Sequence, residues 1–174
     1  MGKRFGIRNE RGFSLVELLT VIMIMGILTA IAVPTFVGSK RNGQDAMAQT
    51  SLRTALSAQR TYYVDYQTYT IDATTLKKIE SQLSFTTTDA KQSGVMGALG
   101  GTPANQAVVL VSTSESGNQF CLMNIATALT AGVNGQTQPG TYYKKNTAKV
   151  TTPPTAVATT QCGPSGYLPT EAGW

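Results

Sequence analysis

The most constraining feature of this chain is an apolar run of 25 residues, from Phe13 to Val37, with a single ionisable side chain, Glu17. As an α-helix, this run would rise about 37 Å, enough to cross a hydrocarbon core of about 30 Å. An acidic side chain deep in a bilayer costs about 2.5 to 3.5 kcal/mol on insertion scales, so it normally has a partner. The run therefore predicts a membrane-crossing helix in which Glu17 needs a counter-group.

The segment that precedes the run is basic. Residues 1–12 have a net charge of +3, from Lys3, Arg4, Arg8 and Arg11 against Glu10. The positive-inside rule places this leader in the cytoplasm and sends the chain after Val37 outward. The remainder keeps 10 of the 14 basic and 8 of the 9 acidic residues, a net charge of only +2. The overall charge of +5 therefore gives no support for a general nucleic-acid-binding surface.

Three interpretations of the apolar run are open at this point. A plain membrane anchor explains the length and the flanking charge, but it does not explain Glu17. A secretory signal peptide would be cut near residues 30–32, yet its apolar region normally spans about 7 to 15 residues, and Pro34 follows this cut closely. The third interpretation is a leader cut after Gly12, which would leave a new amine on Phe13.

The third interpretation supplies a partner for the acid. Phe13 and Glu17 stand one helical turn apart at the end of the apolar helix. In a polymer of identical subunits, the Phe13 ammonium of one subunit could lie against Glu17 of the next. Opposite charges about 4 Å apart attract far more strongly in dry surroundings than in water. Such a pair would offset the burial cost, and Glu17 would set the axial register between subunits.

The sequence Gly12-Phe13-Ser14-Leu15-Val16-Glu17, followed by a long apolar helix, resembles the signature of type IV pilins and pseudopilins. The resemblance covers roughly residues 8–37. It implies that a prepilin peptidase cuts between Gly12 and Phe13 and methylates the new Phe13 amine. It also implies that Glu17 is the assembly glutamate, and that Gly26 and Pro34 are positions where the helix is flexible or kinked.

The helix is expected to continue beyond the membrane as an amphipathic half, residues 38–66. One apolar stripe of helical period consists of Ala48, Leu52, Ala55, Leu56, Tyr62, Tyr63 and Tyr66. This stripe predicts a single helix from Phe13 to about Tyr66 whose second half lies against a sheet. Pro34 lacks an N–H group and should bend or loosen the helix.

Residues 67–174 are expected to form a globular β-sheet head. After a connector at 67–82, with a short helix near 75–83, strand patterns follow at 83–87, 107–113, 119–126 and 141–145. Residues 115–118 predict the turn of an antiparallel hairpin. The glycine-rich patch at Gly94, Gly97, Gly100 and Gly101 is interpreted as a loop. The predicted fold is α+β: a long N-terminal helix packed on a small antiparallel sheet, with a disulfide-closed C-terminal loop.

The two cysteines, Cys121 and Cys162, lie 41 positions apart. They are too few, and too far apart in the sequence, to form a zinc cluster. In an exported protein such a pair is most simply a disulfide. It would staple the Thr- and Pro-rich chain after residue 146, which would be poorly ordered alone, back onto the hairpin. The chain has no histidine, the usual general base and metal ligand. We expect no enzyme activity, no cofactor and no metal site.

These observations favour a structural subunit of a type IV pilus. The expected partners are identical subunits in a helical filament, a prepilin peptidase, and the membrane platform and motor of the pilus machinery. The precursor would span the cytoplasmic membrane once before joining a surface filament.

One alternative is a pseudopilin of a type II secretion system. By family pattern, the major subunit of that system tends to bind calcium, and the acidic residues here are too scattered for such a site. The other is a monomeric membrane-anchored adhesin or DNA receptor. A lysine cluster, Lys144, Lys145 and Lys149, could contact DNA, although a solvated face is the favoured interpretation.

Overall fold

The computed structural model describes residues 12–86, 94–146, 162, 167–169 and 174. The chain forms two compact units, Met1–Lys40 and Arg41–Trp174. The boundary falls inside the first helix. The leader, residues 1–11, and Lys149 lie outside the described residues.

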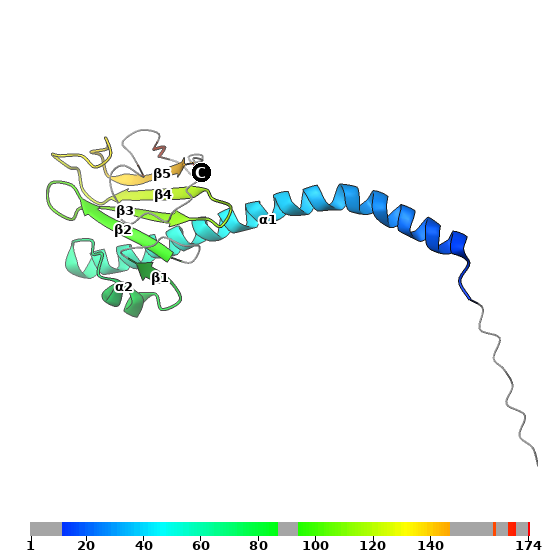
Figure 1. Ribbon diagram of the computed structural model, residues 1–174. Coiled ribbons are helices and arrows are strands. Elements are labelled where there is room, and N and C mark those ends of the chain that lie inside the picture. Colours follow the sequence, from blue (N-terminus) through cyan, green and yellow to red (C-terminus); the bar gives the residue numbers. More distant parts are fainter. Residues whose placement is uncertain (1–11, 87–93, 147–161, 163–166, 170–173) are drawn as a thin grey trace, which may run out of the picture. The chain divides into compact units, whose positions relative to one another are not determined.

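Helix α1 spans Leu15–Tyr66 and continues through Pro34 (Figure 1). The prediction of one long helix is confirmed, and the helix begins two residues later than expected. Phe13 and Ser14 precede it in non-helical conformation. A helix of 52 residues follows from a pattern that is apolar all round in its first half and amphipathic in its second.

The head consists of a short helix and one five-stranded sheet. Helix α2 spans Ala73–Ile79, within the connector where a short helix was expected, and Asp72 caps its start. The strands are β1 (Ser84–Thr86), β2 (Gly94–Gly100), β3 (Ala107–Thr113), β4 (Gln119–Ile125) and β5 (Gly140–Asn146). They lie side by side in chain order, and β2 to β5 are antiparallel. Strand β1 forms an edge of the sheet and pairs in parallel with β2. The sequence predicted an antiparallel sheet and did not predict this parallel pair.

The prediction of a loop at the glycine-rich patch was wrong. Gly94, Gly97 and Gly100 lie in β2, and only Gly101 follows it, with φ of +91°. A Cβ atom at Gly100 would stand 2.7 Å from Val133 Cγ2, closer than real side chains approach. The glycines therefore let neighbouring side chains press directly onto the strand backbone, a recognised use of glycine in strands.

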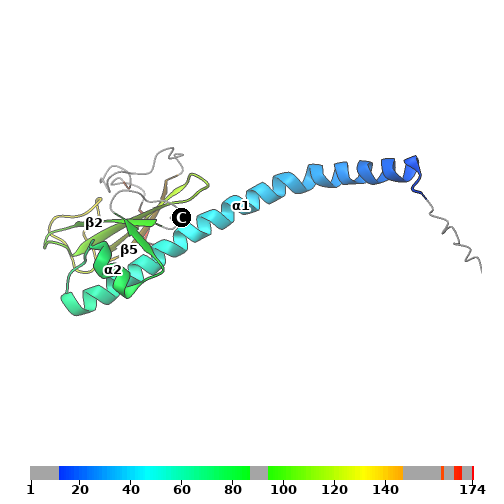
Figure 2. The same ribbon diagram turned by 60° about the horizontal axis from the view of Figure 1, so that its bottom comes forward.

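One face of the sheet packs on the second half of α1, as Figures 1 and 2 both show. The buried core on this face combines Ala48, Leu52, Ala55 and Leu56 of α1 with Val95, Val108, Leu110, Phe120 and Leu122 of the sheet. The predicted stripe is confirmed over these four helix positions. Of the tyrosines, Tyr63 packs against this core, but Tyr62 and Tyr66 stack on each other, and Tyr66 is 63% exposed. The stripe therefore ends at Tyr63.

The opposite face of the sheet is also apolar and covered. Its buried residues are Ala107, Val109, Val111, Cys121, Met123 and Ile125, which pack with Leu129, Tyr142, Cys162 and Tyr167. The Cys121–Cys162 disulfide confirms the predicted bridge and ties the distal chain to β4. Strand β5 exchanges backbone hydrogen bonds with Leu168, and the Trp174 indole N–H donates to the Cys121 carbonyl at 3.1 Å. The expectation of poor order after residue 146 concerns residues that mostly lie outside the described set.

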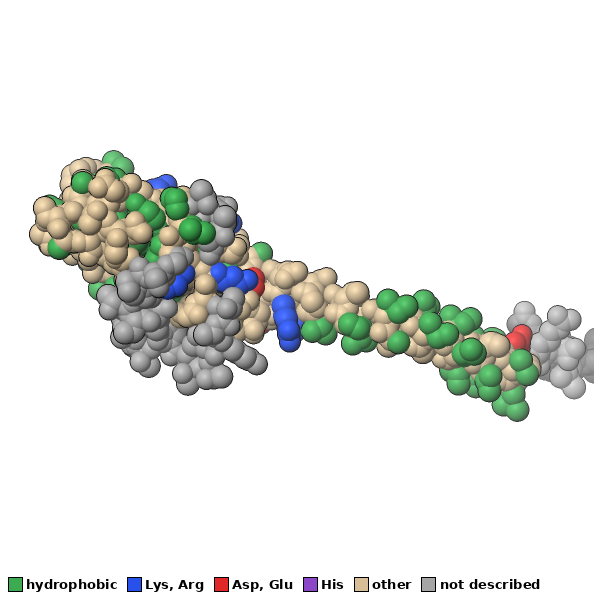
Figure 3. Space-filling view, turned by 90° about the horizontal axis from the view of Figure 1, so that it is seen from above, with side chains coloured by type: hydrophobic (Ala, Val, Ile, Leu, Met, Phe, Trp, Pro, Cys, Tyr) green, Lys and Arg blue, Asp and Glu red, His purple; other side chains and the backbone are tan. Residues whose placement is uncertain are grey.

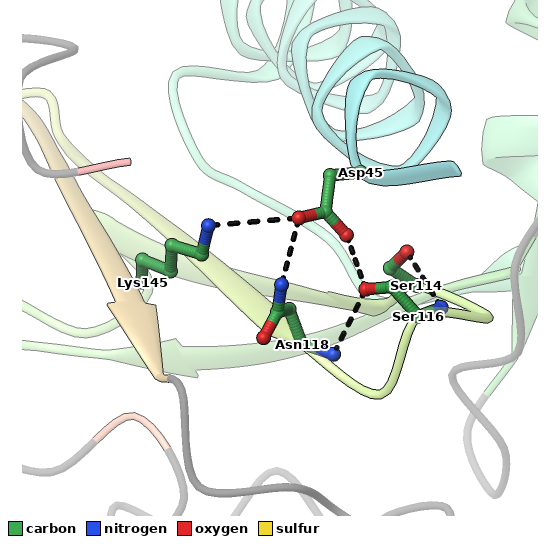
Figure 4. Close-up of polar contacts among 5 residues, drawn as sticks. All are labelled: Asp45, Ser114, Ser116, Asn118 and Lys145. Carbon is green, nitrogen blue, oxygen red and sulfur yellow. Dashed lines mark hydrogen bonds and ion pairs between the residues drawn. The ribbon is translucent and has the colours of Figure 1, made fainter. Parts of the chain in front are cut away.

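A polar cluster holds α1 to the β3–β4 turn, and Figure 4 shows how its side chains converge. Asp45 of α1 is buried and accepts hydrogen bonds from the Ser116 hydroxyl and from Asn118 Nδ2, the latter at 2.7 Å. Lys145 Nζ of β5 lies 3.5 Å from Asp45 Oδ2. Burial alone would raise the pKa of Asp45, but hydrogen bonds from Ser116, Ser114 and Asn118 and the charge of Lys145 together lower the pKa below its ordinary 3.8.

We expect Asp45→Asn to destabilise the head by about 1 to 2 kcal/mol near neutral pH, because it removes charge-assisted hydrogen bonds from a buried site. The depressed pKa of Asp45 means that its contribution is complete above about pH 4 and is lost as pH falls through the folded-state pKa. Urea unfolding at about pH 7 and about pH 3 would measure this, since the gap between variant and wild type should shrink in acid. The exposed Asp65→Asn is the control on the same helix; an equal loss in both variants would contradict the role of the cluster.

Candidate assembly surface

The first half of α1 presents a continuous apolar surface. Every large apolar side chain from Phe13 to Val37 is exposed in the single subunit, from 92% for Phe13 to 44% for Val37. Its most apolar 18-residue window has a mean hydropathy of 2.5, and none of that window is buried. Figure 3 shows these hydrophobic side chains gathered along this part of the helix. By length and composition this helix could cross a membrane, and a surface this apolar requires lipid or protein to cover it.

The hydroxyl groups within this surface are satisfied by the helix itself. Thr20, Thr29 and Thr35 each donate to a backbone carbonyl three or four residues earlier, at 2.7 to 2.9 Å. Such back-bonding is the usual arrangement of threonine inside helices. It keeps these hydroxyl hydrogens from needing a partner in apolar surroundings.

Glu17 lies in the first turn of α1 and has a partner within its own chain. The backbone N–H of Ser14 donates to Glu17 Oε2 at 2.9 Å, and the Ser14 hydroxyl accepts from the N–H of Val16 at 3.3 Å. This is a form of the capping box. In it, the side chains of a serine before the helix and of a glutamate three residues later each accept a hydrogen bond from a backbone N–H group at the start of the helix. The Ser-x-x-Glu spacing was visible in the sequence, but the sequence reasoning considered only a counter-charge from another subunit.

The other residues predicted for this site lie before or within α1. The Gly12–Phe13 bond precedes the helix and is described as non-helical chain. Gly26 and Pro34 both lie inside α1, and nothing stands within 4 Å of a Cβ built at Gly26. Their role as flexible or kinked positions stays a prediction, as do cleavage after Gly12 and methylation of Phe13.

Two of the lysines proposed for DNA contact, Lys144 and Lys145, lie on β5 of the head. Lys145 pairs with Asp45 and lies over the Phe120 ring at 5.3 Å, and Lys144 lies over the Tyr167 ring at 5.7 Å. Both side chains are therefore engaged within the subunit, which favours a structural role over a free cationic surface. Within the described ranges, no group of three or more His, Cys, Asp or Glu residues is placed to hold a metal ion.

Residues 7–33 match the prokaryotic N-terminal methylation motif. The chain is also 29% identical over 147 residues to the type IV wide pilus major component PilA4 of Thermus thermophilus, covering 84% of this chain and 96% of that protein. By this motif and this similarity, the chain resembles type IV pilins. A second pilin, the type IV major pilin protein PilA of Myxococcus xanthus, is 39% identical over 66 residues, 38% of this chain and 30% of that protein.

The pseudopilin branch of the family is also similar to this chain. The type II secretion system core protein G of Dickeya chrysanthemi is 32% identical over 62 residues, 36% of this chain and 40% of that protein. The pilin and pseudopilin relatives are structural subunits and not enzymes. This chain combines the methylation motif, the exposed apolar helix and the Cys121–Cys162 disulfide.

Proposed function

We propose that this pilin-like chain is a structural subunit of a type IV pilus, which polymerises through the apolar half of α1. The observation that carries the proposal is the exposed surface from Phe13 to Val37, with one carboxylate, Glu17, at its start. In the filament, Glu17 pairs with the Phe13 amine of a neighbouring subunit, and the pair sets the register between helices. The similarity to a pilus component over 96% of that protein's length supports this function.

In this function, the chain has four parts. Residues 1–12 are a leader that a prepilin peptidase removes, and the same enzyme methylates Phe13. Residues 13–37 span the cytoplasmic membrane once, with the N-terminus inside, until the subunit is extracted into the filament. Residues 38–66 are the amphipathic half of α1, and 67–174 form the head on the filament surface. The basic leader supports the orientation, and the methylation motif supports the processing.

A pseudopilin of a type II secretion system is the second candidate, because the core protein G relatives match this chain. Those matches extend over 62 and 61 residues, whereas the match to the pilus component extends over 147. The longer match favours the pilus. Electron microscopy of surface filaments in a deletion strain, compared with a secretion assay, separates the two candidates. The monomeric adhesin or DNA receptor predicts no filaments at all.

We expect the protein isolated from cells to begin at Phe13, to be heavier than the unmodified chain by one CH2 unit, and to lack two hydrogens. The first part reports cleavage, the second methylation of the Phe13 amine, and the third the Cys121–Cys162 bond. Intact mass spectrometry before and after reduction measures all three. A mass that corresponds to a mature chain with any first residue other than Phe13 would contradict the proposed cleavage after Gly12.

A further inference from the structure

The start of α1 poses a problem that the filament contact does not solve. The first N–H groups of a helix have no partner within the helix. In apolar surroundings each unsatisfied group costs several kcal/mol, because no water is present to accept its hydrogen bond. A subunit stored in a membrane meets this problem before any neighbour arrives.

The structure assigns a partner to two of these groups. Glu17 Oε2 accepts the Ser14 N–H at 2.9 Å, and Ser14 Oγ accepts the Val16 N–H at 3.3 Å. Both donors are amide groups that remain after cleavage between Gly12 and Phe13. The carboxylate also lies at the positive end of the helix dipole, where a negative charge is stabilised.

We propose that Glu17 has a second role, which precedes assembly: with Ser14 it caps α1 in the isolated membrane subunit. Ser14 is then a positioning residue, which holds the carboxylate at the amino-terminal end of the helix. This inference rests on the proposed membrane storage and assembly of the subunit. It answers how the lone acid is tolerated before a neighbouring subunit supplies a charge.

The cap is compatible with the later ion pair. The described contacts use only Oε2 of Glu17, so Oε1 can accept from a second donor. The capped Glu17 is exposed on the surface of α1, where a group of a neighbouring subunit can reach it. Assembly therefore adds a charged partner to an acceptor already in place, and no rearrangement of Glu17 is needed.

The two roles of Glu17 require different chemistry, so they can be separated. A cap needs a hydrogen-bond acceptor at the third helical position, and glutamine serves there as glutamate does. The ion pair needs a negative charge, which glutamine lacks. Glu17→Gln should therefore keep the cap and lose the pair, whereas Glu17→Ala should lose both.

The test is amide hydrogen exchange at Ser14 and Val16 in the full chain, reconstituted in phospholipid nanodiscs. We expect Glu17→Gln to exchange like the wild type, and Glu17→Ala and Ser14→Ala to exchange on the order of fivefold faster, as the loss of an N-cap predicts. Ser14→Thr should restore protection. Thr29→Ala, which removes a hydroxyl bonded within the same helix, is the control and should leave both amides unchanged.

Filament yield in cells gives the second readout. Glu17→Gln should abolish filaments while the cap stays protected, a split that a merely structural role of Glu17 would not produce. Unchanged exchange in both Glu17→Ala and Ser14→Ala would overturn the cap. Normal filaments from Glu17→Gln would instead overturn the ion pair of the proposed function, and the exchange result would still decide the cap.

Discussion

Glu17→Ala is expected to abolish filaments while the protein is still made, inserted and folded. In the proposed filament, the substitution removes the burial cost of the acid, but it leaves the Phe13 ammonium of the neighbouring subunit without a partner. Removing one member of a buried ion pair typically costs about 3 to 5 kcal/mol. Each 1.4 kcal/mol changes an association constant about tenfold, so every subunit contact would weaken by roughly a hundred- to a few thousandfold.

The effect is largest in a polymer because every contact along the filament carries the same defect. Electron microscopy of surface filaments, with immunoblots of membrane fractions, measures assembly and insertion separately. Glu80→Ala, which removes a carboxylate at the end of α2 in the head, is the matched control and should leave filaments intact. Filaments of normal length and abundance from Glu17→Ala would refute the register pair and favour the monomeric alternatives.

The sequence predicted the elements that have long, regular patterns. The apolar run and the stripe from Ala48 to Leu56 each repeat over several turns, so they predicted α1 almost to its ends. Strands β3 and β4 were predicted because a turn with a glycine, Gly117, separates two apolar segments. Local pattern is a strong signal where the same residues also make the core contacts.

The wrong predictions for the glycine-rich patch and for Tyr66 share a physical cause. The structure at both places depends on contacts with residues that are distant in the sequence. Strand β2 has a glycine at position 100 because Val133 lies against it, and no pattern within residues 94–101 reports that contact. Tyr66 fits the helical stripe by spacing, but the sheet does not cover it, so it stacks on Tyr62. The Ser14–Glu17 cap depends on a local Ser-x-x-Glu spacing that is visible in the sequence. It was missed because the charge of Glu17 was explained only by an ion pair with another subunit.

The disulfide contributes more to this fold than its position near the distal end suggests. Strands β3 and β4 are buried on both faces, and Cys162 and Tyr167 belong to the cluster that covers the face opposite α1. Cys121 is fully buried within β4, and Cys162 is 1% exposed. The bond therefore fixes Cys162, and with it the nearby Tyr167, over an apolar sheet face that would otherwise contact water.

Replacing both Cys121 and Cys162 by alanine is expected to destabilise the head by about 4 kcal/mol, because a 41-residue separation gives a large loop-closure entropy in the chain-entropy model. For a domain of this size, that loss corresponds to a fall in melting temperature of about 10 to 20 °C. Trp174, the single tryptophan, reports the transition because its indole N–H bonds to the Cys121 carbonyl. Thermal unfolding of the full chain in detergent, followed by Trp174 fluorescence, measures the change.

Two controls separate the cross-link from the loss of two sulfur atoms. Wild-type protein reduced with dithiothreitol keeps both side chains and should lose nearly as much stability as the double alanine variant, since the bond and not the thiol volume carries the effect. Either single alanine variant should match the double variant, because one missing partner already opens the loop. A double variant that melts within about 3 °C of the oxidised wild type would show that packing alone holds Tyr167 on this face of the sheet.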